Sequence, residues 1–131
     1  EELHVVGVYE SAQQANPIDV RVHRAAAPMT VVLSAYSPVT WRLDVAPGAR
    51  LRRIILNGYE PQRVEGAPED AEVIDLSGQG RYLSACAYRW PGDDQGCDTQ
   101  RLVRGLEDLL DMPVTSFQGC YNASEADVSD P

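Results

Sequence analysis

The chain has 131 residues, a length that suits one domain with a buried core and is too short for two. Apolar residues make up 44% of the chain, and no apolar run approaches the roughly 18 residues that a membrane helix needs. The formal net charge of −9 argues against nucleic acid and anionic lipid surfaces as partners, because both attract positive charge. The sequence therefore predicts a single soluble domain.

The basic residues and the start of the chain indicate its origin. All eleven basic residues are Arg and none is Lys, as is typical of a GC-rich bacterial genome. The chain begins Glu1-Glu2-Leu3, without an initiator Met and without the apolar segment of a signal peptide. We interpret it as the mature or trimmed form of a bacterial protein that is secreted, periplasmic or on the cell surface.

Two strands are predicted in the first part of the chain. Residues 3–10 are rich in β-branched and aromatic side chains, and residues 18–23 alternate between apolar and polar. If the two strands form an antiparallel hairpin with their apolar faces together, Val6 lies opposite Val22.

The central stretch, residues 30–58, is predicted to form three strands joined by two turns. Within it Val39, Trp41, Leu43 and Val45 alternate with polar residues, a period of two that gives a strand one buried and one exposed face. We expect this stretch to be the middle of an antiparallel sheet, with Trp41 in the core.

The one predicted helix covers residues 99–111. Its apolar residues fall on one stripe: Leu102, Val103, Leu106, Leu109 and Leu110. Gly105 inside the helix costs about 1 kcal/mol relative to Ala, and acidic residues crowd the end where the helix dipole disfavours them. Such a helix is expected to be held by packing.

The rest of the chain leads to the fold class. A short strand is expected at residues 73–76, a longer one at 82–90 and a final one at 114–121, and no internal repeat is found. The pattern predicts a mainly β (α+β) fold: an antiparallel two-layer β-sandwich with one α-helix in the C-terminal half. The sandwich domain is expected to cover residues 1–121, and an acidic C-terminal tail residues 122–131.

Three cysteines fit an oxidising compartment, where two of them can pair. Cys97 and Cys120 each follow a Gly and bracket the predicted helix, so we favour a disulfide between them; Cys86 with Cys97 is the main alternative. Closing that loop would add about 3 kcal/mol by restricting the unfolded chain.

Five stretches resemble sequences of uncharacterised secreted bacterial proteins. They are Leu3-His4-Val5-Val6-Gly7-Val8-Tyr9-Glu10, Ser37-Pro38-Val39-Thr40-Trp41, Asn57-Gly58-Tyr59-Glu60-Pro61-Gln62-Arg63-Val64, Gly96-Cys97-Asp98-Thr99 and Phe117-Gln118-Gly119-Cys120-Tyr121. The resemblance spans most of the chain and implies an extracytoplasmic setting. It brings no established activity, substrate or catalytic residue.

The residue pattern offers little for metal binding or catalysis. His4 and His23 are the only histidines and are separated in the expected register, which disfavours zinc and copper. Asp93, Asp94 and Asp98 share a loop, a set of oxygen ligands that suits calcium, but a solvated acidic loop that caps the helix explains them equally well. There is no Gly-x-Ser-x-Gly elbow and no phosphate-binding loop, so we predict no enzyme activity and no cofactor.

Exposed aromatic residues suggest one possible function. Aromatic rings on a rigid sandwich suit stacking against sugars. Trp90, beside Pro91 at the end of a strand, is the best candidate for exposure, and Tyr88 and Tyr59 are its expected neighbours. A carbohydrate-binding module is therefore our alternative prediction.

The first strand suggests the main prediction. It lies near the N-terminus of the chain, so it can leave its own sheet and complete that of a neighbour. The residues that would be exchanged are Leu3, Val5, Val6, Val8 and Tyr9. We therefore predict a non-enzymatic, extracytoplasmic protein-interaction or structural module, whose partner is another protein or copies of itself.

Overall fold

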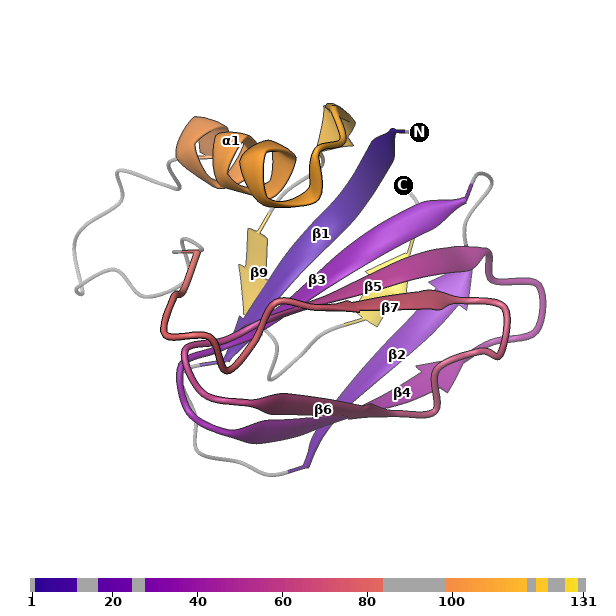
Figure 1. The fold of residues 1–131 in the computed structure, drawn as a ribbon. Helices are drawn as coiled ribbons and strands as arrows, with labels where there is room; N and C mark the ends of the chain where they lie inside the picture. The colour runs from indigo at the N-terminus through magenta and orange to yellow at the C-terminus, as the bar shows by residue number, and fades with distance from the viewer. Residues whose placement is uncertain are drawn as a thin grey trace, which may run out of the picture.

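The computed structural model describes residues 2–11, 17–24, 28–83, 99–117, 120–122 and 127–129, which form strands and one helix (Figure 1). The elements are β1 (Leu3–Ser11), β2 (Ile18–Arg24), β3 (Met29–Ala35), β4 (Val39–Val45), β5 (Leu51–Asn57), β6 (Gln62–Glu65), β7 (Glu72–Asp75), α1 (Thr99–Leu110), β8 (Val114–Phe117), β9 (Cys120–Asn122) and β10 (Asp127–Ser129). The helix in this part of the chain lacks the length and apolar character needed to cross a membrane.

Consecutive strands from β1 to β7 alternate between two sheets. Sheet A has the order β7-β5-β3-β1-β8, with β9 also paired to β1, and sheet B has the order β10-β2-β4-β6. Every pairing between described strands is parallel. The chain therefore winds as a two-sheet solenoid, in which each coil contributes one strand to each sheet (Figure 1).

The antiparallel sandwich predicted from the sequence is wrong. β1 pairs with β3 and not with β2, so the expected hairpin with Val6 opposite Val22 does not form. Alternation of apolar and polar residues fixes which face of a strand is buried, but it carries no information about the direction of the neighbouring strand. Because each strand crosses to the other sheet, its neighbour within a sheet comes one coil later and runs the same way.

The main core lies between the two sheets. Trp41 is fully buried there, as its alternating strand predicted, and its indole N–H donates to Oε1 of Gln62 at 3.2 Å. Sheet A contributes one face of its strands to this core and turns the other face toward α1. Its central strands are therefore largely apolar on both faces, and β3 is buried along its whole length.

Helix α1 covers the outer face of sheet A, as Figure 1 shows. It lies where the sequence predicted a helix, and Leu102 and Leu106 pack against Val8, Val32 and Ile55. The chain then continues into β8, which pairs with β1. The segment after α1 thus returns to the first coil, which consists of β1 and β2. β10, which lies in the C-terminal tail expected from the sequence, pairs with β2.

Candidate functional site

A row of polar side chains crosses sheet A where its strands end. Glu10 of β1 pairs with Ser34 of β3, and Ser34 pairs with Asn57 of β5. All three residues are buried and lie on the face that carries α1, two positions beyond the apolar residues under the helix. Nδ2 of Asn57 donates to Oγ of Ser34 at 3.0 Å. We call these three residues the polar row.

Residues 81–83, which we call the strap, are held to the polar row by hydrogen bonds of Tyr82 and Leu83. Nδ2 of Asn57 donates to the carbonyl oxygen of Leu83 at 2.8 Å, and the Leu83 N–H donates to Oδ1 of Asn57 at 3.1 Å. The hydroxyl of Tyr82 donates to Oε1 of Glu10. The side chains of the polar row therefore hydrogen-bond to the chain's own strap, and these bonds fix the position of Tyr82.

Tyr36 and Tyr59 gather with Tyr82 of the strap into a cluster of three tyrosines. The rings of Tyr36 and Tyr59 stack with their centroids 5.1 Å apart and their planes inclined by 7°. Tyr82 meets Tyr36 edge to face, with centroids 5.8 Å apart and an angle of 89°. Tyr36 is 57% exposed and Tyr59 41% exposed, so this tyrosine cluster presents aromatic surface to solvent.

The coil geometry explains the stack. Tyr36 follows β3 and Tyr59 follows β5, each two residues beyond the paired residues Ser34 and Asn57. Neighbouring strands lie about 4.8 Å apart, so side chains at equivalent positions of successive coils stack on each other. The backbone joins the two corners as well, because the N–H of Glu60 donates to the carbonyl oxygen of Tyr36 at 3.3 Å.

A buried glutamine holds the corner on which the two tyrosines sit. Nε2 of Gln62 lies 3.1, 2.8 and 3.1 Å from the carbonyl oxygens of Ala35, Ser37 and Glu60. Gly58 makes room for it, since a Cβ there would lie 2.5 Å from Nε2 of Gln62. The cluster therefore rests on a fixed backbone, as a preorganised binding surface requires.

The sequence holds a signal for this cluster that the motif analysis missed. Leu33-Ser34-Ala35-Tyr36-Ser37-Pro38 and Leu56-Asn57-Gly58-Tyr59-Glu60-Pro61 share the pattern Leu-x-x-Tyr-x-Pro. The structure pairs Leu33 with Leu56, so the two segments are equivalent turns of successive coils. The repeat is short, with three shared positions in six residues, but it marks the turns that are equivalent in successive coils.

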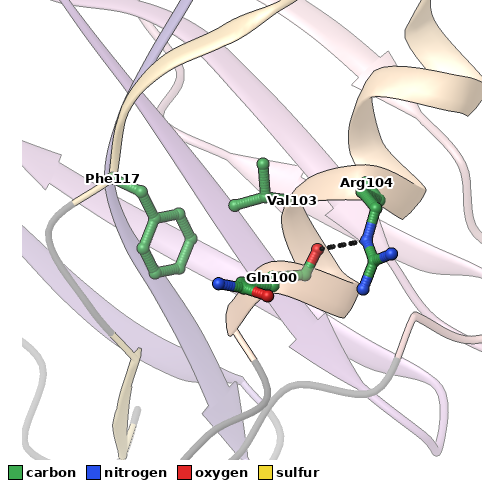
Figure 2. Close-up of a pocket in the computed structure, with 4 residues that line it drawn as sticks. All are labelled: Gln100, Val103, Arg104 and Phe117. Carbon is green, nitrogen blue, oxygen red and sulfur yellow. Dashed lines mark hydrogen bonds between the residues drawn. The ribbon is translucent and has the colours of Figure 1, made fainter.

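A groove of about 460 Å³ lies between α1 and β8 (Figure 2). Among the described residues Gln100, Val103 and Arg104 of α1 and Phe117 of β8 line it. Nε of Arg104 donates to the carbonyl oxygen of Gln100 at 3.3 Å, which folds the guanidinium back along the helix. The sequence analysis did not anticipate this groove, because it assembles residues from two elements.

The residues proposed for sugar binding and for a disulfide are only partly described. Tyr59 belongs to the tyrosine cluster. Tyr88, Trp90 and Cys97 lie outside the described residues, and so do the calcium candidates at 93, 94 and 98. Cys120 begins β9, but its side chain is not described, so the Cys97–Cys120 disulfide stays a prediction.

The residues proposed for strand exchange are all buried. β1 lies between β3 on one side and β8 and β9 on the other. The side chains of the five residues are between 0% and 7% exposed: Leu3, Val5, Val6, Val8 and Tyr9. Exchange of this strand would therefore break pairings along both of its edges.

The histidines and acids do not converge in the described ranges. His4 lies on sheet A, where its Nε2 is 3.2 Å from Oε1 of Glu2, and His23 lies on sheet B. No group of three or more histidines, cysteines and carboxylates in these ranges is placed to hold a metal ion. The calcium loop falls outside them, so this finding does not bear on it.

One exposed ion pair on sheet B has a structural explanation. Asp19 of β2 pairs in register with Arg42 of β4, whose Nε donates to Oδ1 of Asp19 at 2.6 Å. This hydrogen bond lowers the pKa of the Asp19 carboxyl below its usual range. Both side chains are exposed, so the pair links neighbouring coils and forms no enclosed site.

Comparison of the chain with protein-family models, with curated proteins and with solved structures finds no match.

Proposed function

We propose that this protein is an extracytoplasmic binding module and that its tyrosine cluster holds a neutral saccharide. The observation that carries the proposal is the exposed, parallel stack of Tyr36 and Tyr59 at one corner of the solenoid. Tyrosine rings offer an apolar face and a polar hydroxyl, the combination that suits the CH face and the hydroxyl groups of a sugar ring.

The charge of the molecule favours a neutral ligand. The net charge of −9 opposes the approach of anions but leaves an uncharged sugar unaffected. Exposed Glu60 follows Tyr59 directly, and its carboxylate can accept hydrogen bonds from ligand hydroxyls. The fixed corner built on Gln62 and Gly58 also limits the entropy lost when a ligand binds.

The proposal is tested by titrating the chain with soluble oligosaccharides of several linkage types, including cello-, xylo-, chito- and laminari-oligosaccharides. Binding is followed by intrinsic fluorescence and by calorimetry. We expect at least one series to bind, and Tyr59→Ala to weaken its affinity about tenfold because one stacking face is lost. Tyr59→Trp keeps a flat ring and should retain binding.

Val73→Ala is the matched control, because Val73 is also 41% exposed but lies on β7, away from the three rings. The variant should bind as the parent does. Failure of every neutral series to bind, or equal affinities for the parent and Tyr59→Ala, would contradict the proposal.

Assembly with copies of itself is the second candidate function, and the edge of the solenoid favours it. Among the described strands β7 has only β5 as a partner, and its Val73 is a large apolar side chain that is 41% exposed. An open strand edge can add a strand from another chain. We place this contact at β7 because β1 is paired on both edges.

Light scattering and negative-stain imaging test the second candidate. Oligomers are expected for the parent, and Val73→Lys should shift them toward monomers because a charge on an edge strand opposes strand addition. Thr115→Lys, an exposed change on β8, is the control. A strictly monomeric parent at high concentration rules this candidate out.

A further inference from the structure

From the groove between α1 and β8 we infer that this chain has a second binding site, which takes a small monocarboxylate with an apolar body. The site is separate from the tyrosine cluster and from the strap. It does not depend on the proposed saccharide binding.

The groove has the volume of a small-molecule site, although it is shallow and open to solvent. Its volume of about 460 Å³ falls within the range of roughly 300–1,000 Å³ that such sites occupy. Val103 on α1 and Phe117 at the end of β8 face it as apolar walls (Figure 2). Both side chains are half-buried, so an apolar ligand would cover surface that now meets water.

A guanidinium supplies the polar anchor. The Arg104 side chain uses its Nε to reach the carbonyl oxygen of Gln100, and its two Nη atoms lie beyond that contact (Figure 2). Two Nη groups on one planar guanidinium fit a carboxylate better than a hydroxyl or an amine. The Gln100 side chain also lines the groove and offers a second donor.

The charges on α1 and β8 also favour a carboxylate as the ligand. Glu107 lies one turn beyond Val103, but its Oε2 accepts the N–H of Val114 at 3.0 Å and so holds the start of β8. Among the described residues that line the groove, Arg104 is the only charged one. The net charge of −9 opposes anions over the molecule as a whole, so the attraction for a carboxylate in this groove has to come from the nearby guanidinium of Arg104.

Titration of the isotope-labelled chain with hexanoate, hexanol and hexylamine tests the inference, with amide NMR shifts as the readout. Hexanoate should saturate with shifts that gather at residues 100–104 and 114–117, and it should bind more tightly than the alcohol or the amine. Arg104→Gln should weaken hexanoate about tenfold, because a charge-assisted bidentate contact is lost.

Arg101→Gln is the matched control, since it removes the same charge from the same helix at a residue that does not line the groove. It should change the affinity less than about twofold. Val103→Thr keeps the shape of the wall, adds a hydroxyl and should weaken all three ligands together. Melting curves identify any variant that fails to fold.

Three results would overturn the inference. They are the absence of saturable shifts in the groove with hexanoate, equal binding of hexanoate and hexanol, and equal losses of hexanoate affinity in the two arginine variants. Binding of oligosaccharides is a separate measurement on Tyr59→Ala, so the two sites succeed or fail independently.

Discussion

At the scale of single residues, Gln62 shows how a buried polar side chain fixes this fold. It is 4% exposed, donates into a corner with three carbonyl oxygens and accepts from the indole of Trp41. Gln62→Glu keeps the shape but replaces the donor with an oxygen. We expect a loss of about 3 kcal/mol of stability at pH 7, measured by urea unfolding, because a buried acceptor then faces other acceptors.

The same variant should depend on pH. Burial beside carbonyl oxygens raises the pKa of the introduced carboxyl in the folded state, whereas its value in the unfolded chain is about 4.3. The deficit relative to the parent therefore grows as the pH rises above about 4.3 and is smaller at pH 4. Gln79→Glu, at an exposed position, is the control and should cost little. A deficit that does not change with pH would contradict this account.

Tyr82 is, with Leu83, one of the two strap residues that hydrogen-bond to the polar row. Tyr82→Phe removes its hydroxyl and should cost about 1–2 kcal/mol in urea unfolding, because the buried Glu10 loses a donor. The cost should be smaller in a Glu10→Gln background, where the acceptor is neutral. Tyr59→Phe, on an exposed ring, is the control. Equal costs for the two Tyr→Phe variants would show that the hydrogen bond adds no stability.

At the scale of elements, the end of α1 carries backbone strain. Asp111 follows the helix with a φ of 52°, a left-handed conformation that glycine adopts more easily, and its N–H donates to the carbonyl oxygen of Glu107 at 2.8 Å. Its charge also lies at the negative end of the helix dipole. Asp111→Gly removes both the backbone strain and the unfavourable charge. We expect the free energy of unfolding, measured by thermal unfolding, to rise by about 1 kcal/mol.

Asp108→Asn separates the two causes of this gain. Asp108 is exposed near the same end of the helix but has a helical backbone, so its variant removes only a charge. Its gain should be a few tenths of a kcal/mol. If it stabilises the protein as much as Asp111→Gly does, backbone strain is not the cause.

The elements also show what the sequence could predict. The positions of β1 to β5 and α1 follow from β-branched and apolar runs, from alternation in β2 and β4, and from the apolar stripe of the helix, and Trp41 is buried as its strand requires. Strand direction was not encoded in these local patterns. The interior Gly105 looked unfavourable, and the structure supplies the reason: a Cβ there would lie 2.7 Å from Cδ2 of Leu83.

The candidate site was predictable only in part, for the same reason. Tyr59 was chosen as an exposed aromatic residue, but its partner Tyr36 and the strap lie on other coils. Their meeting depends on the pairing of Ser34 with Asn57, a long-range contact that a local motif does not specify. The repeated Leu-x-x-Tyr-x-Pro pattern was the available sign of that pairing.

At the scale of the whole molecule, the first and last coils have different neighbours. The segments after α1 pair with β1 and β2, so the first coil is covered on both sides. Among the described strands β6 and β7 each have one partner. In stacked repeats each coil is stabilised by its contacts with the neighbouring coils. The last coil has a neighbour on one side only among the described strands, so it should open before the first.

Two substitutions in one row of sheet A test this order. Val8 pairs with Val32, Val32 with Ile55 and Ile55 with Ile74, all on the face under α1. Val8→Ala should cost about 2 kcal/mol and speed amide hydrogen exchange in every strand, because the coil that it loosens has neighbours on both sides. Ile74→Ala should speed exchange mainly in β6 and β7. Faster exchange in β1 and β3 after Ile74→Ala, by as much as after Val8→Ala, would mean that the solenoid opens as one unit.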